Sequence, residues 1–168
     1  MTVYTTVDSP LGDLLLVGEE TPTAAGGTAL VSLSLPGQKG AAEIQGGWRF
    51  APEAFEEIAR QLGAYFAGQL TAFSIACARG AGTEFQRRVW RTLEEIPYGE
   101  TVTYGEVAAH VGSPGPGVRA VGTAIGRNPL LVVRPCHRVI GADGTLRGYA
   151  GGLKNKELLL GLEGALVP

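Results

Sequence analysis

The spacing of apolar and polar residues first favours strands and only later helices. Residues 3–7 and 13–18 are rich in Val, Thr and Leu, and the Ser-Pro-Leu-Gly sequence between them is typical of a turn, so they predict a β-hairpin. Apolar and polar residues alternate over 28–35, which predicts a third strand with one buried face. Residues 19–27 and 36–47 are rich in Gly, Ala, Thr and Pro and are expected to be loops.

A helical period begins after these loops. Phe55, Ile58, Leu62 and Tyr65 recur at intervals of three or four residues, which predicts an amphipathic helix that ends near Gly68. Such a helix has one apolar stripe to bury. We therefore expect it to pack on the sheet that the preceding strands form.

The stretch 69–81 has no clear period, and we place a domain boundary there. It separates a sheet-and-helix domain, 1–80, from a second domain, 81–168. The second domain opens with Thr83 and Gln86, whose spacing fits a capping box, in which side chains and backbone amides bond reciprocally at a helix start.

More helices are expected in the second domain. Two short ones, at about 104–111 and 118–127, are joined by a Gly- and Pro-rich turn, which is typical of a helix-turn-helix, although this pattern also occurs in proteins that do not bind DNA. A last helix is expected from 154 to 162. The fold class is therefore α/β (α+β): a small N-terminal antiparallel sheet with a helix, then a mainly helical domain with a winged-helix-like helix-turn-helix.

The composition is that of an ordinary folded protein. The chain has 168 residues, of which 45% are apolar and 18% charged, and this excludes a disordered chain. No apolar run approaches the ~20 residues that a membrane helix needs, and no signal peptide is visible. Residues 81–168 carry ten bases and eight acids, whereas residues 1–80 carry four bases and eight acids. This asymmetry allows a nucleic-acid face on the second half without establishing one.

The cysteines argue against a metal site. Cys77 and Cys136 are far apart in sequence, and no two cysteines have metal-ligand spacing, so we expect no structural zinc. Distant cysteines in a chain without a signal peptide favour free thiols in a reducing compartment, and hence the cytoplasm.

The strongest local signal is the sequence from Pro135 to Arg138. Pro135 stiffens the approach to Cys136, and His137 follows it directly. A thiolate is the nucleophilic form of cysteine, and the neighbouring histidine, Arg134 and Arg138 are groups that favour it. A buried cysteine beside an unrelated histidine would give the same dipeptide, so these residues alone leave both interpretations open.

Several blocks around this signal resemble one family. They share its order and nearly its spacing: Thr83–Phe85, Ile96–Thr101, Arg119–Gly122, Asn128–Pro129, Pro135–Val139 and Gly148–Gly152. The family is that of the O6-alkylguanine-DNA alkyltransferases, or methylated-DNA–protein-cysteine methyltransferases. The resemblance covers about 82–164, and the first 80 residues share only the family's order of strands and helix.

The resemblance implies a DNA repair protein that acts once. It would flip O6-alkylguanine, and O4-alkylthymine, out of duplex DNA and move the alkyl group irreversibly to its own cysteine. The chemistry agrees with this, because a stacked base is out of reach until it is extruded and an alkyl carbon on oxygen is open to attack by a thiolate. The implied partner is double-stranded DNA with alkylated guanine; no metal, no cofactor and no membrane are implied, and the protein would be a monomer.

The resemblance also assigns catalytic roles. Cys136 would accept the alkyl group, His137 would act as its base through a water molecule, and Glu163 would orient that histidine, as in a hydrolase triad. Asn128 would brace the active-site turn, although it would also suit the end of a helix. Lys156 would tie the terminal helix to the site.

The remaining assignments concern the substrate and DNA. Arg119 would fill the gap that the flipped base leaves, and Tyr104 would crowd the 3′ phosphate, promote flipping and border the substrate pocket. Gln86 and Ser113 lie at positions where the family contacts phosphates, or they are plain surface residues. The other pocket-lining positions are Val139, Tyr149 and Ala150.

The sequence departs from the family pattern in three ways. The turn between Pro114 and Arg119 is one residue longer than usual. Arg134 stands where the family usually has an aliphatic residue, and it would contact DNA phosphate, lower the thiol pKa or extend to solvent along an apolar surface. The zinc ligands found in some N-terminal domains of the family are absent.

Two other functions remain possible on the residues alone. One is a cysteine hydrolase with a Cys136–His137 dyad, although such enzymes usually bring the histidine from a distant part of the chain. The other is a non-repairing DNA-binding module of the alkyltransferase-like kind, which lacks the cysteine in this motif. Stoichiometry separates the three: a hydrolase turns over, a repair protein accepts one alkyl group, and a binding module accepts none.

Overall fold

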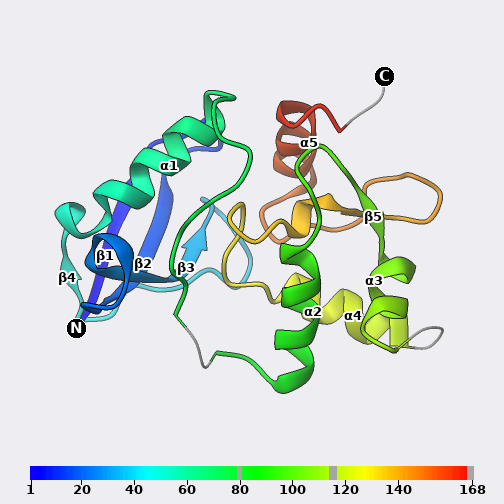
Figure 1. Ribbon diagram of the computed structural model, residues 1–168, viewed down its shortest axis with the longest axis horizontal. Coiled ribbons are helices and arrows are strands. Elements are labelled where there is room, and N and C mark those ends of the chain that lie inside the picture. The colour runs from blue at the N-terminus through cyan, green and yellow to red at the C-terminus, as the bar shows by residue number, and fades with distance from the viewer. Residues whose placement is uncertain (79–80, 114–116, 166–168) are drawn as a thin grey trace. The chain divides into compact units, whose positions relative to one another are not determined.

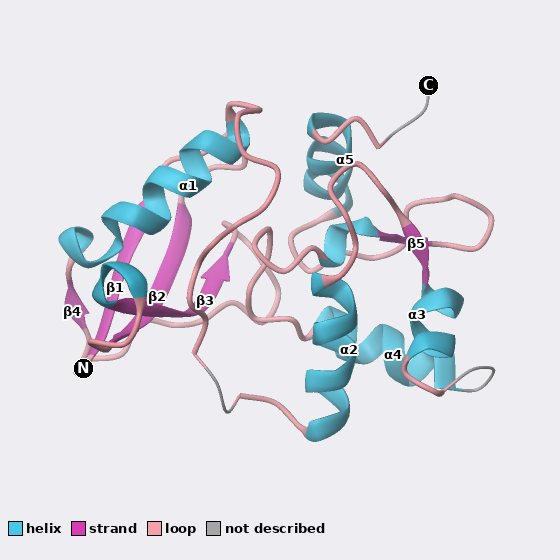
Figure 2. Ribbon diagram, in the orientation of Figure 1, coloured by secondary structure: helices cyan, strands magenta, loops and turns pink. Residues whose placement is uncertain are grey.

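The computed structural model describes residues 1–78, 81–113 and 117–165, which form two compact units, Met1–Gly80 and Ala81–Pro168. Strands are concentrated in the first unit and helices in the second (Figure 1, Figure 2). The mixed α/β class expected from the sequence is confirmed. None of the described helices is long and apolar enough to cross a membrane.

A four-stranded sheet with the order β3-β2-β1-β4 is the frame of the first unit. Its strands are β1 (Thr2–Val7), β2 (Leu14–Glu20), β3 (Thr28–Ser34) and β4 (Arg49–Phe50). β1 and β2 form the predicted antiparallel hairpin, and β3 continues the sheet antiparallel to β2. β4 pairs parallel to β1 and was not predicted, because two residues are too few to show a period.

β3 differs from its prediction in one respect. Its hydroxyl residues Thr28, Ser32 and Ser34 are buried as well as its leucines, so the prediction of a single buried face is wrong. The loop after β3 folds back over it, and the amide of Ala42 donates to the Ser34 hydroxyl at 3.4 Å. The alternation of apolar and polar residues predicts which face is apolar, but it does not predict that a polar face stays exposed. Small hydroxyl groups can be buried at modest cost when they find a hydrogen-bond partner.

The predicted amphipathic helix is confirmed as a short 3₁₀ turn, η2 (Pro52–Phe55), followed by α1 (Glu56–Phe66), which lies against the sheet (Figure 1). All residues of its apolar stripe are buried: Phe55, Ile58, Leu62 and Tyr65. Gly18 makes this packing possible, because a Cβ there would lie 3.1 Å from the Phe55 ring. Gly68 adopts a positive φ of 76° just beyond the helix, as a helix-terminating glycine does.

The second unit is mainly helical. Its elements are α2 (Glu84–Glu94), β5 (Val102–Thr103), α3 (Tyr104–His110), α4 (Gly117–Gly126), the 3₁₀ turn η3 (Cys136–Arg138), β6 (Val139–Ile140) and α5 (Leu153–Leu162). The capping box at α2 is confirmed: the Gln86 amide donates to the Thr83 hydroxyl, and the Thr83 amide donates to the Gln86 side chain. The parallel pair of β5 and β6 was not predicted, again because each strand has only two residues.

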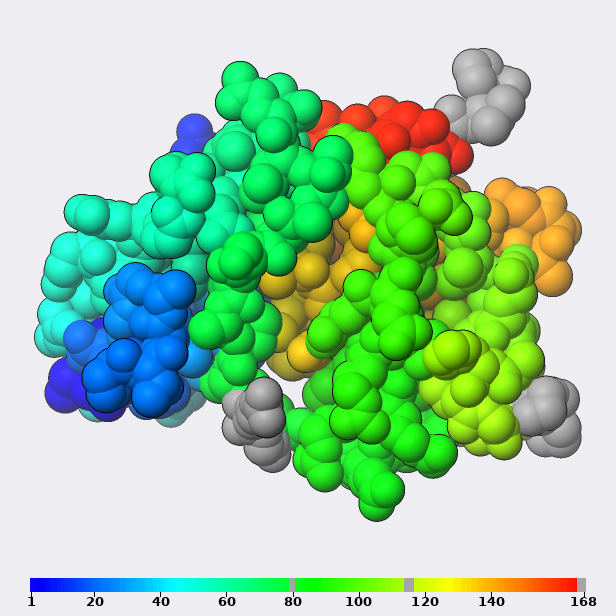
Figure 3. All heavy atoms as spheres, in the orientation of Figure 1, coloured from blue at the N-terminus to red at the C-terminus, as the bar shows by residue number. Residues whose placement is uncertain are grey.

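Helices α2, α3 and α4 pack against one another and form the core of this unit. Trp90 of α2 belongs to that core, since its indole NH donates to the Ala124 carbonyl of α4 at 2.9 Å. Side chains of α2 form part of the surface of the second unit that faces the viewer in Figure 3. α3 and α4 correspond to the predicted helix-turn-helix, but Gly115 and Pro116 of its longer turn lie outside the described residues.

Candidate active site

A strained turn leads the chain into the site. Val132 has a positive φ of 71°, which a β-branched residue adopts only when its surroundings enforce it. Asn128 supplies that enforcement: its Oδ1 accepts from the Leu130 amide at 3.0 Å, and its Nδ2 donates to the Arg134 carbonyl at 3.0 Å. Asn128 therefore lies where it can brace the active-site turn, the role that the resemblance implied for it.

Cys136 begins the 3₁₀ turn η3, and its thiol is buried, with 4% of the residue exposed. Burial raises the pKa of this thiol to about 11, because a thiolate loses its hydration there. A hydrogen bond from Asn128 and the charges of Lys156 and Arg134 lower the pKa, but by less than burial raises it. Arg134 thus favours the thiolate as expected, but burial outweighs it, and the thiol needs a base when it reacts.

We predict a steep pH dependence for this thiol. Since its pKa is about 11, the rate of Cys136 alkylation by iodoacetamide should rise about tenfold per pH unit from neutral pH to about pH 9, without a plateau. Peptide-resolved mass spectrometry follows Cys136 separately from Cys77. The same protein in urea is the control, where both thiols should level off near pH ~8.5. A plateau near that pH in the folded protein would contradict a raised pKa.

His137 is completely buried, and its Nε2 lies 2.8 Å from Oε2 of Glu163. Burial lowers the pKa of this histidine, which keeps the imidazole neutral at neutral pH, although Glu163 opposes the shift. A carboxylate only accepts hydrogen bonds, so the ring proton sits on Nε2 and Nδ1 carries the lone pair. Nδ1 is buried without a hydrogen-bond partner among the described residues. This tautomer gives the site a neutral base.

Arg138 shares the same carboxylate. Its Nε donates to Oε1 of Glu163 at 2.7 Å, its Nη2 donates to Oε2 at 2.9 Å, and its Nη1 donates to the Ile96 carbonyl. The bidentate pair holds the Glu163 carboxylate fixed beside His137. Sequence reasoning placed Arg138 beside the thiol and missed this pairing, which joins residues 25 apart and has no local signal.

Lys156 ties α5 to the segment that precedes it. Its ammonium is fully buried and donates to the carbonyls of Val139 at 2.6 Å, Arg147 at 3.3 Å and Gly148 at 3.5 Å. Burial lowers the pKa of this lysine to about 8, while the neighbouring Cys136 raises it. The lysine thus holds together β6 and the loop that carries the predicted pocket residues.

Tyr104, at the start of α3, lies next to Lys156 and the loop that Lys156 holds. Its hydroxyl donates to the Gly148 carbonyl at 3.4 Å, and the Lys156 ammonium lies 5.8 Å from the centre of its ring. Its pKa is raised by burial and by the negative charge that a Cys136 thiolate would carry. A Cβ on Gly122 would lie 3.9 Å from the ring, so Tyr104 joins α4 to the site.

The other predicted site residues differ in how far their side chains are buried. Val139 is buried within it, whereas Tyr149 and Ala150 are half-buried in the following loop. Arg119 is exposed on α4. The Gln86 side chain is engaged in the cap of α2, and Ser113 is half-buried just before the segment outside the described residues.

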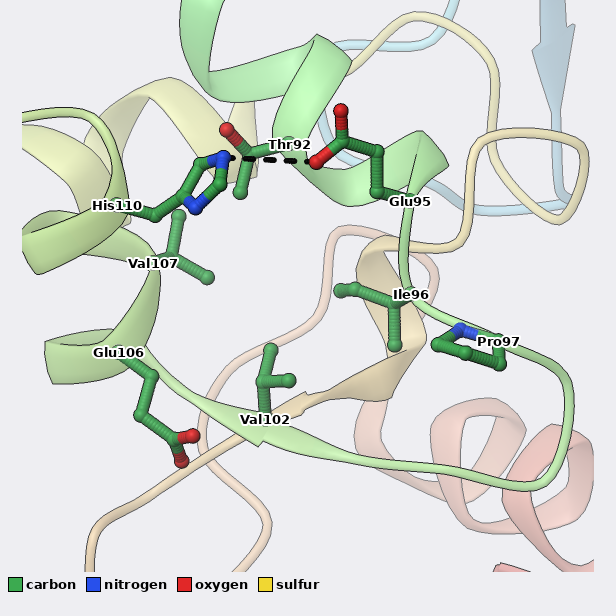
Figure 4. A pocket seen from close by; sticks show the side chains of 8 residues that line it. All are labelled: Thr92, Glu95, Ile96, Pro97, Val102, Glu106, Val107 and His110. Carbon is green, nitrogen blue, oxygen red and sulfur yellow. Dashed lines mark ion pairs between the residues drawn. The ribbon is translucent and has the colours of Figure 1, made fainter.

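A separate pocket of about 240 Å³ lies between α2, β5 and α3 (Figure 4). An ion pair at 3.4 Å joins two of its lining residues, Glu95 and His110, while Ile96, Val102 and Val107 form its apolar part. None of the predicted site residues lines it. In the described part of the chain, no three His, Cys, Asp or Glu side chains are grouped as metal ligands would be.

Comparisons with known proteins identify the family. Residues 2–78 match the model of the 6-O-methylguanine DNA methyltransferase ribonuclease-like domain, and residues 84–165 match that of the 6-O-methylguanine DNA methyltransferase DNA binding domain. The chain therefore belongs to the family of the methylated-DNA–protein-cysteine methyltransferases, as the sequence predicted.

Individual relatives resemble the chain over nearly its whole length. The methylated-DNA–protein-cysteine methyltransferase of Mycolicibacterium paratuberculosis is 51% identical over 97% of this chain and 93% of its own. That of Methanosarcina acetivorans is 49% identical, over 96% and 98%. The crystal structure of Mycobacterium tuberculosis OGT in complex with DNA has a TM-score of 0.86 and 45% identity, and the match covers 97% of this chain and 93% of that one.

Proposed function

We propose that this protein repairs DNA by moving the alkyl group of O6-alkylguanine, and of O4-alkylthymine, onto its own Cys136 in a single turnover. The observation that carries the proposal is the buried group of Cys136, His137 and Glu163, with the histidine held in the tautomer of a base. Family membership supports the proposal, as does the relative that was crystallised with DNA.

The residues of the site supply what the reaction needs. The Cys136 thiol passes its proton to Nδ1 of His137, through a water molecule, and its sulfur attacks the alkyl carbon. The new sulfur–carbon bond replaces the carbon–oxygen bond, whose electron pair stays on the base, and the base takes up a proton to become guanine. Glu163 stabilises the imidazolium that forms, because it already accepts a hydrogen bond from Nε2.

The thioether product explains why the reaction would stop after one cycle. An alkylated sulfur has no proton to give and cannot become a thiolate. We assign no second nucleophile that could remove the alkyl group from it. We assign Val139, Tyr149, Ala150 and Tyr104 to the pocket for the base. We place the protein in the cytoplasm as a monomer, because a free thiol needs a reducing compartment and one chain holds the whole cluster.

Extrusion of the base is assigned to the second unit. A target atom inside the base stack is accessible only after the nucleotide rotates out, and the gap that it leaves must be filled. Arg119 is exposed on α4, the second helix of the helix-turn-helix, and Tyr104 joins that helix to the site. Gln86 and Ser113 are proposed phosphate contacts. The exposed position of Arg119 on α4 supports its assignment as the residue that occupies the gap.

Arg119→Ala is expected to slow repair of duplex DNA about tenfold or more and to leave the reaction with free O6-benzylguanine within about twofold. The arginine stabilises the extruded state, which a free base does not need. The ratio of the two rates is the measurement, because it cancels any change in Cys136 itself. Equal losses on both substrates would remove Arg119 from the flipping step.

Stoichiometry tests the proposed function. With an excess of duplex DNA that contains O6-methylguanine, methyl loss from the DNA should level off at one group per protein chain. A cysteine hydrolase would continue to turn over, and a non-repairing binding module would bind the DNA and remove no methyl group. Either outcome would refute the proposal.

A further inference from the structure

Arg134 occupies a place in the site that the sequence left open. Its Nε donates to Oε1 of Glu94 on α2 at 3.0 Å, and its guanidinium lies 5.1 Å from the centre of the Trp90 ring. The side chain is only 13% exposed, whereas that of Glu94 is 51% exposed. The guanidinium is thus held inside the second unit by an ion pair and a ring, and it does not extend into solvent.

The same side chain reaches the turn that leads to Cys136. Nη1 of Arg134 donates to Oδ1 of Asn128 at 3.4 Å. Asn128 in turn donates through Nδ2 to the backbone carbonyl of Arg134, and that carbonyl accepts the amide of Cys136 at 2.7 Å. A chain of contacts therefore runs from Glu94 through Arg134 and Asn128 to Cys136.

We propose that Arg134 is a positioning residue for Cys136, because it anchors the bracing Asn128 to α2 through Glu94. A guanidinium suits this task, since its planar fork can donate to two acceptors at once. The Oδ1 atom of Asn128 accepts from Arg134 and from the Leu130 amide, which leaves its Nδ2 atom to donate to the Arg134 carbonyl at 3.0 Å. The Asn128 side chain also forms the hydrogen bond that lowers the pKa of the thiol. The amide of Asn128 is thus fixed in one orientation.

The charge of Arg134 also acts on the thiol. It lowers the pKa of Cys136, together with the hydrogen bond from Asn128 and the charge of Lys156. Among the described residues, Tyr104 also interacts with the thiol, since its pKa is raised in part by the thiolate charge, and His137, the next residue in the chain, is neutral. Removal of Arg134 should therefore raise the pKa of Cys136 by two routes, the loss of a positive charge and the loosening of Asn128.

Arg134→Leu tests the proposal through the reaction of Cys136 with iodoacetamide as a function of pH. We expect the thiol pKa to rise by about half a unit, so that alkylation is about threefold slower at every pH below it. A merely structural role predicts the opposite, because a loosened site exposes a buried thiol and speeds its alkylation. A contact with DNA phosphate predicts no change in this assay. Both of these results would overturn the proposal.

Further variants separate geometry from charge. Arg134→Lys keeps the positive charge but loses the planar guanidinium that donates to two acceptors. Glu94→Gln removes the ion pair at a half-exposed residue, where the change should not impair folding. Each should slow Cys136 alkylation by less than Arg134→Leu does. Arg127→Leu removes an exposed arginine next to Asn128 and is the matched control, expected to match wild type. If Glu94→Gln and Arg134→Lys both behave as wild type, the anchoring role is wrong.

The relevance of Arg134 to alkyl transfer rests on the proposed function. Transfer from O6-benzylguanine should slow in parallel with iodoacetamide alkylation across the same variants. If wild-type protein accepts no alkyl group, the proposed function fails, while the iodoacetamide series still decides whether Arg134 positions Cys136. If transfer is intact in wild type and unchanged in Arg134→Leu, the positioning role fails alone.

Discussion

Cys136→Ser is expected to lower alkyl transfer from O6-methylguanine DNA by more than about a thousandfold, with DNA affinity within about twofold of wild type. A serine hydroxyl holds its proton far more tightly than a thiol, and its oxygen is a poorer nucleophile than sulfur toward a saturated alkyl carbon. The residues assigned to DNA lie on other segments, namely Gln86 on α2, Tyr104 on α3, Ser113 just after α3 and Arg119 on α4, so binding should persist. Methyl transfer and fluorescence anisotropy with the same duplex measure the two properties.

Cys77→Ser is the matched control for this experiment. Cys77 is half-buried in the first unit, beside β3, and belongs to no group that we assign to the reaction. Its replacement should leave transfer unchanged. Transfer that survives in Cys136→Ser, or is lost in Cys77→Ser, would place the acceptor elsewhere.

Glu163→Gln is expected to lower the free energy of unfolding by about 3–5 kcal/mol, because it leaves the charge of Arg138 buried without its partner. Both side chains are buried, and the carboxylate accepts two hydrogen bonds from the guanidinium. Glu163 also lies at the C-terminal end of α5, where the helix dipole disfavours a negative charge. Its ion pair with Arg138 offsets this effect. Urea unfolding measures this loss.

The double variant Glu163→Gln/Arg138→Met separates stability from catalysis. Replacement of both charges removes the uncompensated arginine, so part of the lost stability should return. Transfer should remain low in both variants, because His137 still lacks the carboxylate that fixes its tautomer and stabilises its protonated form. A loss below about 1 kcal/mol in Glu163→Gln, or transfer restored in the double variant, would contradict the shared role of Glu163.

The sequence predicted the features that depend on local patterns. The stripe from Phe55 to Tyr65 and the capping box of Thr83 and Gln86 have the spacing of a helix, and the structure confirms both. The two-residue strands β4, β5 and β6 were missed because they exist only through pairing with distant segments. The burial of Ser34 likewise depends on a loop that folds back, which alternation cannot report.

The site shows the same division between local and distant signals. The block around Cys136 and its resemblance to a family pointed to His137, Asn128 and Glu163, and the structure pairs His137 with Glu163 and places a hydrogen bond from Asn128 at the Cys136 thiol. Their electrostatics could not be predicted, because the raised thiol pKa follows from burial, which the sequence does not state. The pairing of Arg138 with Glu163 was missed for a similar reason, since it depends on how α5 returns to η3.

The acceptor itself provides the most direct test of the central claim. Wild-type protein is mixed with an equal amount of duplex DNA that contains O6-methylguanine, digested, and mapped by tandem mass spectrometry. We predict that one methyl group is present, that it lies on the sulfur of Cys136, and that Cys77 and His137 are unmodified. A methyl group on another residue, or a DNA strand that loses its methyl group while Cys136 stays unmodified, would contradict the account.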